Sequence, residues 1–254
     1  ISSGRQHLIV SGEEMSTRFG ASEIERLRAF FAQFFDEIRV IAYLRAPHAY
    51  MSSALQEVVK TRPCSLLEAP FPDYQQRLGP WEAAFGREAI DYVMFARDTL
   101  AGQDVVSDFA ARVGLPPGQV KGKRINESMS AEVFATLYKL RNGPRRSKLA
   151  WPEERLVRVG RRFQQFGKQR FALADTVWPE LTEAQVADIA WAEDRLGGSF
   201  PAEPLRPDAL VFRSEAEILA FADKNKAAIR HWSRRLMPWR EILRLRFQSF
   251  RKGR

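Results

Sequence analysis

The residues best suited to chemistry in this sequence are an arginine and a serine that follow its strongest apolar run. Arg45 closes the β-branched run Arg39–Leu44, and Ser53 comes eight residues later. A guanidinium presents a planar fork of donors that suits a phosphate, and a nearby hydroxyl adds another donor. The pair therefore favours phosphate binding, although a salt bridge at a strand end and a solvent-facing serine explain the same spacing.

The elements around this pair should place it at the rim of a sheet. The run Arg39–Leu44 predicts a strand, and Pro47 suits the first turn of a helix that extends to about Lys60. Ligands of parallel sheets bind beyond the carboxyl ends of strands, where helix N-termini with free N–H groups converge. We therefore expect Arg45 to face such a site.

The rest of the N-terminal half predicts alternating strands and helices. Short apolar runs at His7–Ser11 and Ile90–Phe95 indicate two more strands. Helices are expected from Ser22, which forms a capping box with Glu25, from Asp73 and from Asp104. Strands separated by helices pair in parallel, so the expected fold class is α/β.

The C-terminal half is expected to be mostly helical. After residue 118 no run predicts a strand, and we expect two domains, an α/β core at 1–125 and a helical region at 126–254. The expected helices are Ser130–Leu140, Glu153–Ala174, Thr182–Leu196, which starts with a capping box, and Ser214–Arg230.

The stretch Arg39–Pro47 with the serines behind it resembles a known family. It is similar to the 3′-phosphate-binding strand and helix of bacterial sulfotransferases that use 3′-phosphoadenosine-5′-phosphosulfate (PAPS). The likeness covers roughly residues 7–140. It depends on the order and spacing of several motifs together, and no single motif is decisive. They include Tyr74–Leu78, Trp81–Gly86, Tyr92–Phe95, Asp108-Phe109, Val113–Leu115 and Asn126–Ser130.

The resemblance implies a P-loop-like parallel sheet flanked by helices, with Arg45 and Ser53 on the 3′-phosphate of the cofactor. It also implies transfer of a sulfuryl group from PAPS to a hydroxyl or amine acceptor, a glycan being one candidate. The family's first strand and its Lys/Gly/Ser-Thr loop for the 5′-phosphosulfate have no match here. Either they precede Ile1 in a longer chain, which we expect, or the chain lacks this activity.

Two further contacts are expected for such a reaction. Glu13 follows the expected strand His7–Ser11, so it should lie at the same sheet edge as Arg45 and serve as the base. In the family a basic loop with glycine closes over the 3′-phosphate, and Lys123 and Arg124 occupy the equivalent place. A surface carboxylate and a solvated basic loop remain alternatives for these residues.

The basic character of the chain lies mainly in its last residues. The net charge is +9, and the segment 230–254 holds nine Lys/Arg against one acid, Glu241. Trp232, Leu236, Trp239 and Leu243 recur at helical spacing beside arginines, a composition typical of a helix on an anionic membrane surface. Packing of this stripe against the helical half is the alternative.

Other function classes find little support. Three histidines and one cysteine give neither a recognisable metal site nor an internal disulfide, and no nucleic-acid motif occurs. We expect neither a metal nor a nucleic-acid partner, and a cytoplasmic protein, peripheral at the inner face of the membrane if its tail binds lipid. A non-catalytic protein that binds an anion or a membrane surface on a sulfotransferase-like scaffold is the competing hypothesis.

Overall fold

The computed structural model describes residues 7–12, 14–116, 120, 129–142, 167–202 and 207–226. In these ranges the chain is α/β, with eight α-helices and two parallel two-stranded sheets, which confirms the expected class. Two compact units interleave along the chain rather than dividing once near residue 125. The first comprises Ile1–Pro47, Phe71–Lys123 and Glu180–Glu203, and the second His48–Pro70, Arg124–Pro179 and Pro204–Arg254.

The first unit is built around strands β1 (Val40–Leu44) and β2 (Ile90–Met94), both expected from the sequence. They pair in parallel from Val40 opposite Ile90 to Leu44 opposite Met94. Helices surround this pair in the order α1 (Met15–Arg18), α2 (Ala21–Phe31), α4 (Tyr74–Phe85), α5 (Val105–Arg112) and α8 (Glu183–Leu196), with short turns η2 (Arg87–Ala89) and η3 (Ala101–Gln103).

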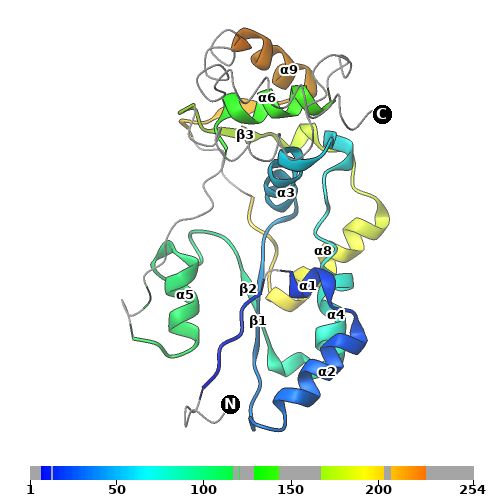
Figure 1. The fold of residues 1–254 in the computed structure, drawn as a ribbon, viewed down its shortest axis with the longest axis vertical. Coiled ribbons are helices and arrows are strands. Elements are labelled where there is room, and N and C mark those ends of the chain that lie inside the picture. The colour runs from blue at the N-terminus through cyan, green and yellow to red at the C-terminus, as the bar shows by residue number, and fades with distance from the viewer. Residues whose placement is uncertain are drawn as a thin grey trace, which may run out of the picture. The chain divides into compact units, whose positions relative to one another are not determined.

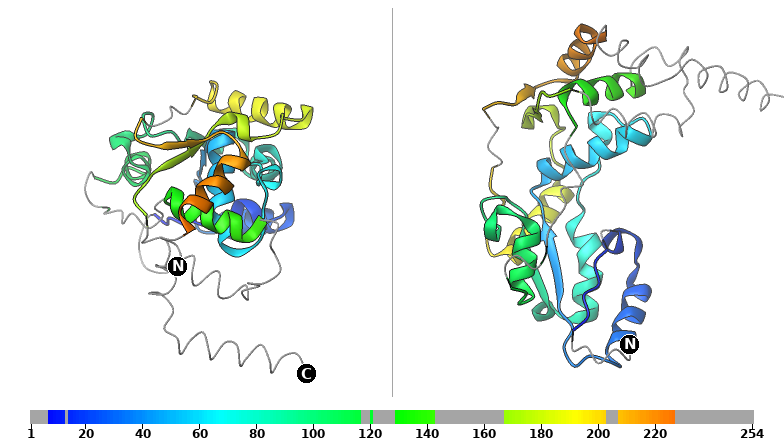
Figure 2. Two further views of the ribbon diagram at one scale, coloured as in Figure 1. Left: turned by 90° about the horizontal axis from the view of Figure 1, so that it is seen from above. Right: turned by 60° about the vertical axis from the view of Figure 1, so that its left-hand side comes forward.

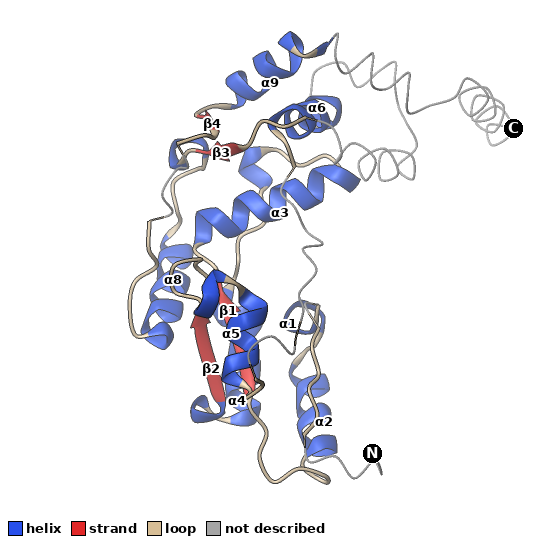
Figure 3. Cartoon of the chain, turned by 90° about the vertical axis from the view of Figure 1, so that its left-hand side faces the viewer, coloured by secondary structure: helices blue, strands red, loops and turns tan. Residues whose placement is uncertain are grey.

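The alternation of side chains along the strands gives the pair two different faces. Ala42, Leu44 and Tyr92 point to one face and join the buried core with side chains of α2, α4 and α8. Tyr43 and Asp91 point to the other face, toward α5. Figures 1 and 3 show this layering, with α5 on one side of the strands and α4 on the other.

Several helix ends follow the local signals in the sequence. Gly86 ends α4 with φ +86°, and the Asp104 carboxylate caps α5 by accepting from the Ser107 N–H at 3.1 Å. Thr182 and Gln185 form the expected capping box of α8. The capping box predicted at Ser22 is wrong, because α2 starts one residue earlier and the Glu23 carboxylate accepts from the Gly20 N–H at 3.1 Å.

The predicted strand at His7–Ser11 is also wrong. Residues 7–12 form no strand, and the side chains of Leu8, Ile9 and Val10 are each about half exposed, at 52%, 49% and 52%. An apolar run becomes a strand only when a neighbour pairs with its backbone, and β1 and β2 pair with each other alone among the described residues.

The second unit combines helices with a small sheet. Its elements are α3 (Pro47–Thr61), which begins at the predicted proline, η1 (Leu66–Glu68), α6 (Ala131–Asn142), β3 (Phe171–Leu173), η4 (Asp175–Val177), β4 (Leu210–Phe212) and α9 (Glu215–Lys224). β3 and β4 pair in parallel, from Phe171 opposite Leu210 to Leu173 opposite Phe212. α6 packs against α9 (Figure 2).

These strands correct two predictions for the C-terminal half. The expectation of no strand after residue 118 is wrong. The helix predicted over Glu153–Ala174 is wrong over residues 167–174, which form no helix and contain β3, and its part at 153–166 lies outside the described residues. Ring contacts of Phe171 and Phe212 with each other, and with Phe134 and Phe221, stabilise the paired strands.

No helix among the described residues is long and apolar enough to cross a membrane. Cys64 is a free thiol, fully buried beside the backbone of η1.

Candidate functional site

Arg45 lies where the sequence predicts it, one residue beyond the carboxyl end of β1. The Phe95 N–H donates to the Leu44 carbonyl at 2.7 Å, so the strand pair ends directly at Arg45 and Phe95. α3 begins two residues later, at Pro47. Arg45 therefore occupies the rim at which parallel sheets present their ligand sites.

Residues of the first unit contact both the backbone and the side chain of Arg45. The Tyr74 hydroxyl, at the start of α4, donates to the carbonyl of Arg45. The half-buried guanidinium lies 6.0 Å from the centroid of the Phe95 ring. A cation held against an aromatic face loses less conformational freedom when it binds an anion.

A polar network under the same rim joins β1 to α5. The Asp108 carboxylate, 4% exposed, accepts from the Tyr43 hydroxyl at 2.7 Å and from Arg112 Nε at 2.6 Å. Burial raises the pKa of Asp108, but the hydrogen bonds from Arg112, the Ala101 N–H and Tyr43 outweigh it, so the pKa lies below its usual range. Asp108 is therefore an ionised structural group.

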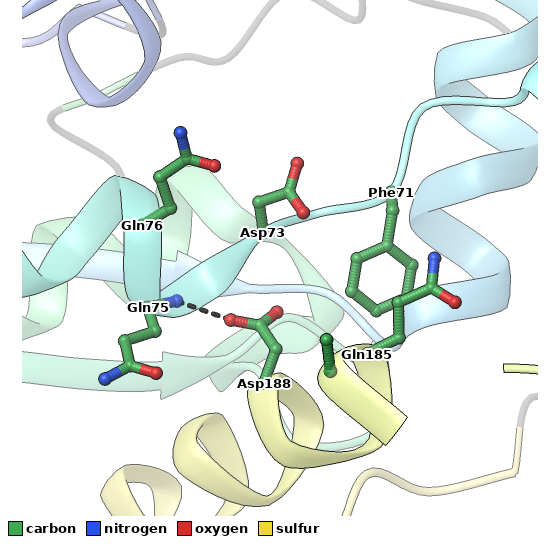
Figure 4. Close-up of a pocket in the computed structure, with 7 residues that line it drawn as sticks. Phe71, Asp73, Gln75, Gln76, Gln185 and Asp188 are labelled. Atoms are coloured by element: carbon green, nitrogen blue, oxygen red, sulfur yellow. Dashed lines mark hydrogen bonds between the residues drawn. The ribbon is translucent and has the colours of Figure 1, made fainter. Parts of the chain in front are cut away.

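A pocket of about 350 Å³ opens beside the first turn of α4 (Figure 4). The Asp188 carboxylate, on α8, accepts there from the N–H groups of Tyr74 and Gln75 at 2.8 and 2.7 Å. The N-terminus of α4 is thus occupied by a carboxylate of the chain itself. The pocket is lined by Phe71, Asp73, Gln75, Gln76, Ala184, Gln185 and Asp188.

The electrostatics of this pocket oppose a phosphate. It contains two carboxylates and no cationic side chain in its lining. Partial burial and the negative charge of Asp188 raise the pKa of Asp73, against the opposing effect of Arg77. A multiply charged phosphate would add to this repulsion, so the rim at Arg45, and not this pocket, is the candidate phosphate site.

The other predicted contacts stay predictions. Ser53 lies on α3 in the second unit, half-buried, and its hydroxyl makes no hydrogen bond in the part of the chain that the structure describes. Glu13, Lys123, Arg124 and the tail 230–254 lie outside the described residues. Glu13 was expected at the sheet edge because a strand was predicted at His7–Ser11, and these residues form no strand.

A pair of residues that the sequence did not connect lies in the second unit. His48, in the first turn of α3, has Nδ1 2.8 Å from Oδ1 of Asp175 in η4. A histidine held by a carboxylate is a frequent component of acid–base sites. Local patterns in the sequence could not connect the two residues, because 127 positions separate them.

Comparison with known proteins adds no family. No family model, characterised protein or solved structure matches this chain. Within the described ranges no group of three or more His, Cys, Asp and Glu residues could hold a metal ion.

Proposed function

We propose that this chain binds PAPS and transfers its sulfuryl group to a hydroxyl or amine acceptor. The observation that carries the proposal is the place of Arg45, directly beyond the carboxyl end of a strand in a parallel pair. The resemblance of Arg39–Pro47 to the 3′-phosphate-binding segment of bacterial sulfotransferases supplies the cofactor. A P-loop-like sulfotransferase fold is part of the same proposal.

Sulfuryl transfer makes clear demands on the protein. The acceptor must attack sulfur in line with the departing phosphate, whose growing negative charge needs cationic donors. Arg45 supplies a fixed cation for the 3′-phosphate, with Ser53, Lys123 and Arg124 as the proposed further contacts. A contact to the 3′-phosphate positions the nucleotide and takes no part in bond breaking. Loss of such a contact should therefore weaken nucleotide binding first.

Calorimetric titration with adenosine 3′,5′-bisphosphate tests the proposal. Arg45→Ala should weaken binding about tenfold to a hundredfold, because a hydrogen bond to a charged group contributes about 1.5–3 kcal/mol. Arg39→Ala is the matched control, since Arg39 stands at the amino end of the same strand and is half exposed. Equal weakening by both substitutions, or no binding by the unchanged chain, contradicts the proposal.

Ser53 can be tested on its own with its neighbour as the control. Ser52 and Ser53 are adjacent on α3 and both are half-buried, so Ser52→Ala changes the helix as little as Ser53→Ala does. If Ser53 shares the 3′-phosphate, only Ser53→Ala weakens binding, by several-fold. The same effect of both substitutions would show that Ser53 does not contact the phosphate, without bearing on the contact proposed for Arg45.

A further inference from the structure

The pocket beside the first turn of α4 has a lining that the proposed function leaves unused. All of its residues belong to the first unit, in the segments Phe71–Lys123 and Glu180–Glu203. One part of the lining precedes or begins α4, the other part lies on α8, and the two helices pack against each other. A volume of about 350 Å³ is enough for a small organic molecule.

Two carboxylates line this pocket, and their charges are compensated unequally. Asp188 accepts from the N–H groups of Tyr74 and Gln75 at 2.8 and 2.7 Å, so the N-terminus of α4 compensates part of its charge. The Asp73 side chain makes no capping hydrogen bond to α4. Partial burial, and then the negative charge of Asp188, raise the pKa of Asp73. A cation between the two carboxylates would offset their repulsion and favour the ionised form of Asp73.

Neutral groups complete the lining. The half-buried ring of Phe71 borders the same space as the two carboxylates (Figure 4). An aromatic face attracts an organic cation and packs against an aliphatic stem, whereas it offers no ligand to a metal ion. Gln75 and Gln76 add amide groups whose carbonyl oxygens can accept from N–H donors. The pocket therefore suits a ligand with a cationic head and a short apolar stem.

We propose that this pocket binds the primary ammonium group of an aliphatic amine. An ammonium group has three donors and no acceptor, which matches two carboxylates and the amide oxygens beside them. The aliphatic stem packs against the Phe71 ring. A free amine and the lysine side chain of a peptide share this chemistry, and two probes distinguish them. The inference is independent of the proposed function, because none of these residues belongs to the proposed nucleotide contacts.

Calorimetric titration of the full chain with 1,4-diaminobutane tests the binding. 1,4-Butanediol is the matched control ligand, since it has the same carbon chain and no charge. The titrations are made at an ionic strength of about 0.15 M, where charges farther apart than about 8 Å are largely screened. We expect the diamine to bind in the millimolar range and the diol not to bind. Equal heats from the two ligands overturn the inference.

A pair of charge-removing substitutions locates the site. Asp73→Asn should weaken binding of the diamine about threefold to tenfold, because it removes one charge from the pocket. Glu183→Gln is the matched control, since Glu183 is exposed in the first turn of α8 but does not line the pocket. It should change the affinity by less than about twofold. Equal weakening by both variants would reveal a general attraction to an acidic surface and overturn the site.

Phe71→Leu tests the aromatic wall, because leucine keeps an apolar side chain but has no aromatic face. Binding of the diamine should weaken about twofold to fivefold, the usual contribution of a cation near an exposed ring. Urea denaturation of the variant checks that the first unit stays folded. An unchanged affinity would refute the contact with Phe71.

The pKa of Asp73 provides a readout that does not depend on affinity. Carboxyl-carbon NMR follows Asp73 across the pH range, and the signal missing from Asp73→Asn identifies it. A bound ammonium group stabilises the ionised carboxylate, so saturation with the diamine should lower the pKa of Asp73. An unchanged pKa at saturation overturns the inference.

Nα-acetyl-lysine N-methylamide distinguishes a free amine from a peptide. Tighter binding of the diamine than of this amide identifies a free amine as the ligand. Tighter binding of the amide assigns the pocket to a lysine side chain, because only the amide carries the backbone of a peptide. Failure of both probes to bind overturns the inference.

Discussion

The guanidinium of Arg195 binds the Glu82 carboxylate through two nitrogens, with Nε 2.8 Å from Oε2 and Nη2 3.0 Å from Oε1. The two residues lie 113 positions apart, on α8 and α4. Tyr92 on β2 adds a hydroxyl that donates to Oε2 of Glu82 at 2.9 Å, and the guanidinium lies 3.8 Å from the Trp191 ring centroid. This network joins the late segment Glu180–Glu203 to the first unit.

Removal of the arginine should destabilise the first unit. In Arg195→Met the Glu82 carboxylate, whose side chain is 19% exposed, keeps its desolvation but loses its charged partner. We expect a loss of about 2–3 kcal/mol in the free energy of unfolding, measured by urea denaturation. Arg26→Ala breaks an ion pair whose arginine is 75% exposed, and it should cost less than about 1 kcal/mol. Similar losses for both variants would contradict this role for Arg195.

The ion pair between Arg195 and Glu82 predicts that the stability of the fold depends on pH. The hydrogen bonds from Arg195, more than those from Tyr92, hold the pKa of Glu82 below its usual range despite burial. A carboxyl group with a lowered pKa in the folded state stabilises the fold above the unfolded pKa, about 4.3, and this contribution disappears as the pH falls further. Unfolding of Glu82→Gln should therefore depend less on pH between about pH 5 and pH 3 than unfolding of the unchanged chain. Parallel pH curves would contradict it.

For Asp73 we expect the opposite effect of the ionised carboxylate on stability. Its pKa is raised, so its ionised form destabilises the fold at neutral pH, and its side chain makes no capping hydrogen bond to α4. Its backbone has φ +46° and ψ +55°, a region that asparagine tolerates well. Asp73→Asn should raise the unfolding free energy at pH 7, by less than about 1 kcal/mol because the residue is exposed. The gain should vanish below about pH 4, and a loss of stability at pH 7 would count against it.

Two helix-terminal glycines should respond differently to the same substitution. Gly86 ends α4 at φ +86°, ψ +149°, a region open essentially to glycine alone, whereas Gly197 ends α8 at φ +69°, ψ +24°. Gly86→Asn should cost about 2–3 kcal/mol, and Gly197→Asn less than about 1 kcal/mol, because asparagine adopts the left-handed conformation. Thermal or urea unfolding of both variants measures the difference, and equal costs would refute it.

Local signals in the sequence predicted much of the first unit. The β-branched run before Arg45 gave β1, and Gly86, Asp104 and Thr182 marked helix ends through interactions that span only a few residues. Arg45 at the end of a parallel strand was predictable for the same reason, because strand, arginine and helix follow one another directly along the chain.

Interactions between distant segments were not predictable from local patterns. β3 and β4 have three residues each, too few to show a period, and they form only because they pair with each other. The apolar run at residues 7–11 shows the converse, since it has a strand's composition but pairs with no strand in the described ranges. His48 and Asp175 meet only in the folded chain, so their spacing in the sequence could not reveal the contact between them.

Binding of the nucleotide's 3′-phosphate by Arg45, as proposed, can be tested by a cycle of four titrations. Adenosine 3′,5′-bisphosphate and adenosine 5′-monophosphate are titrated into the unchanged chain and into Arg45→Ala. We expect the 3′-phosphate to strengthen binding to the unchanged chain about tenfold or more, and to add almost nothing to binding by the variant. The same ratio of affinities in both proteins would place the 3′-phosphate away from Arg45 and refute the proposed contact.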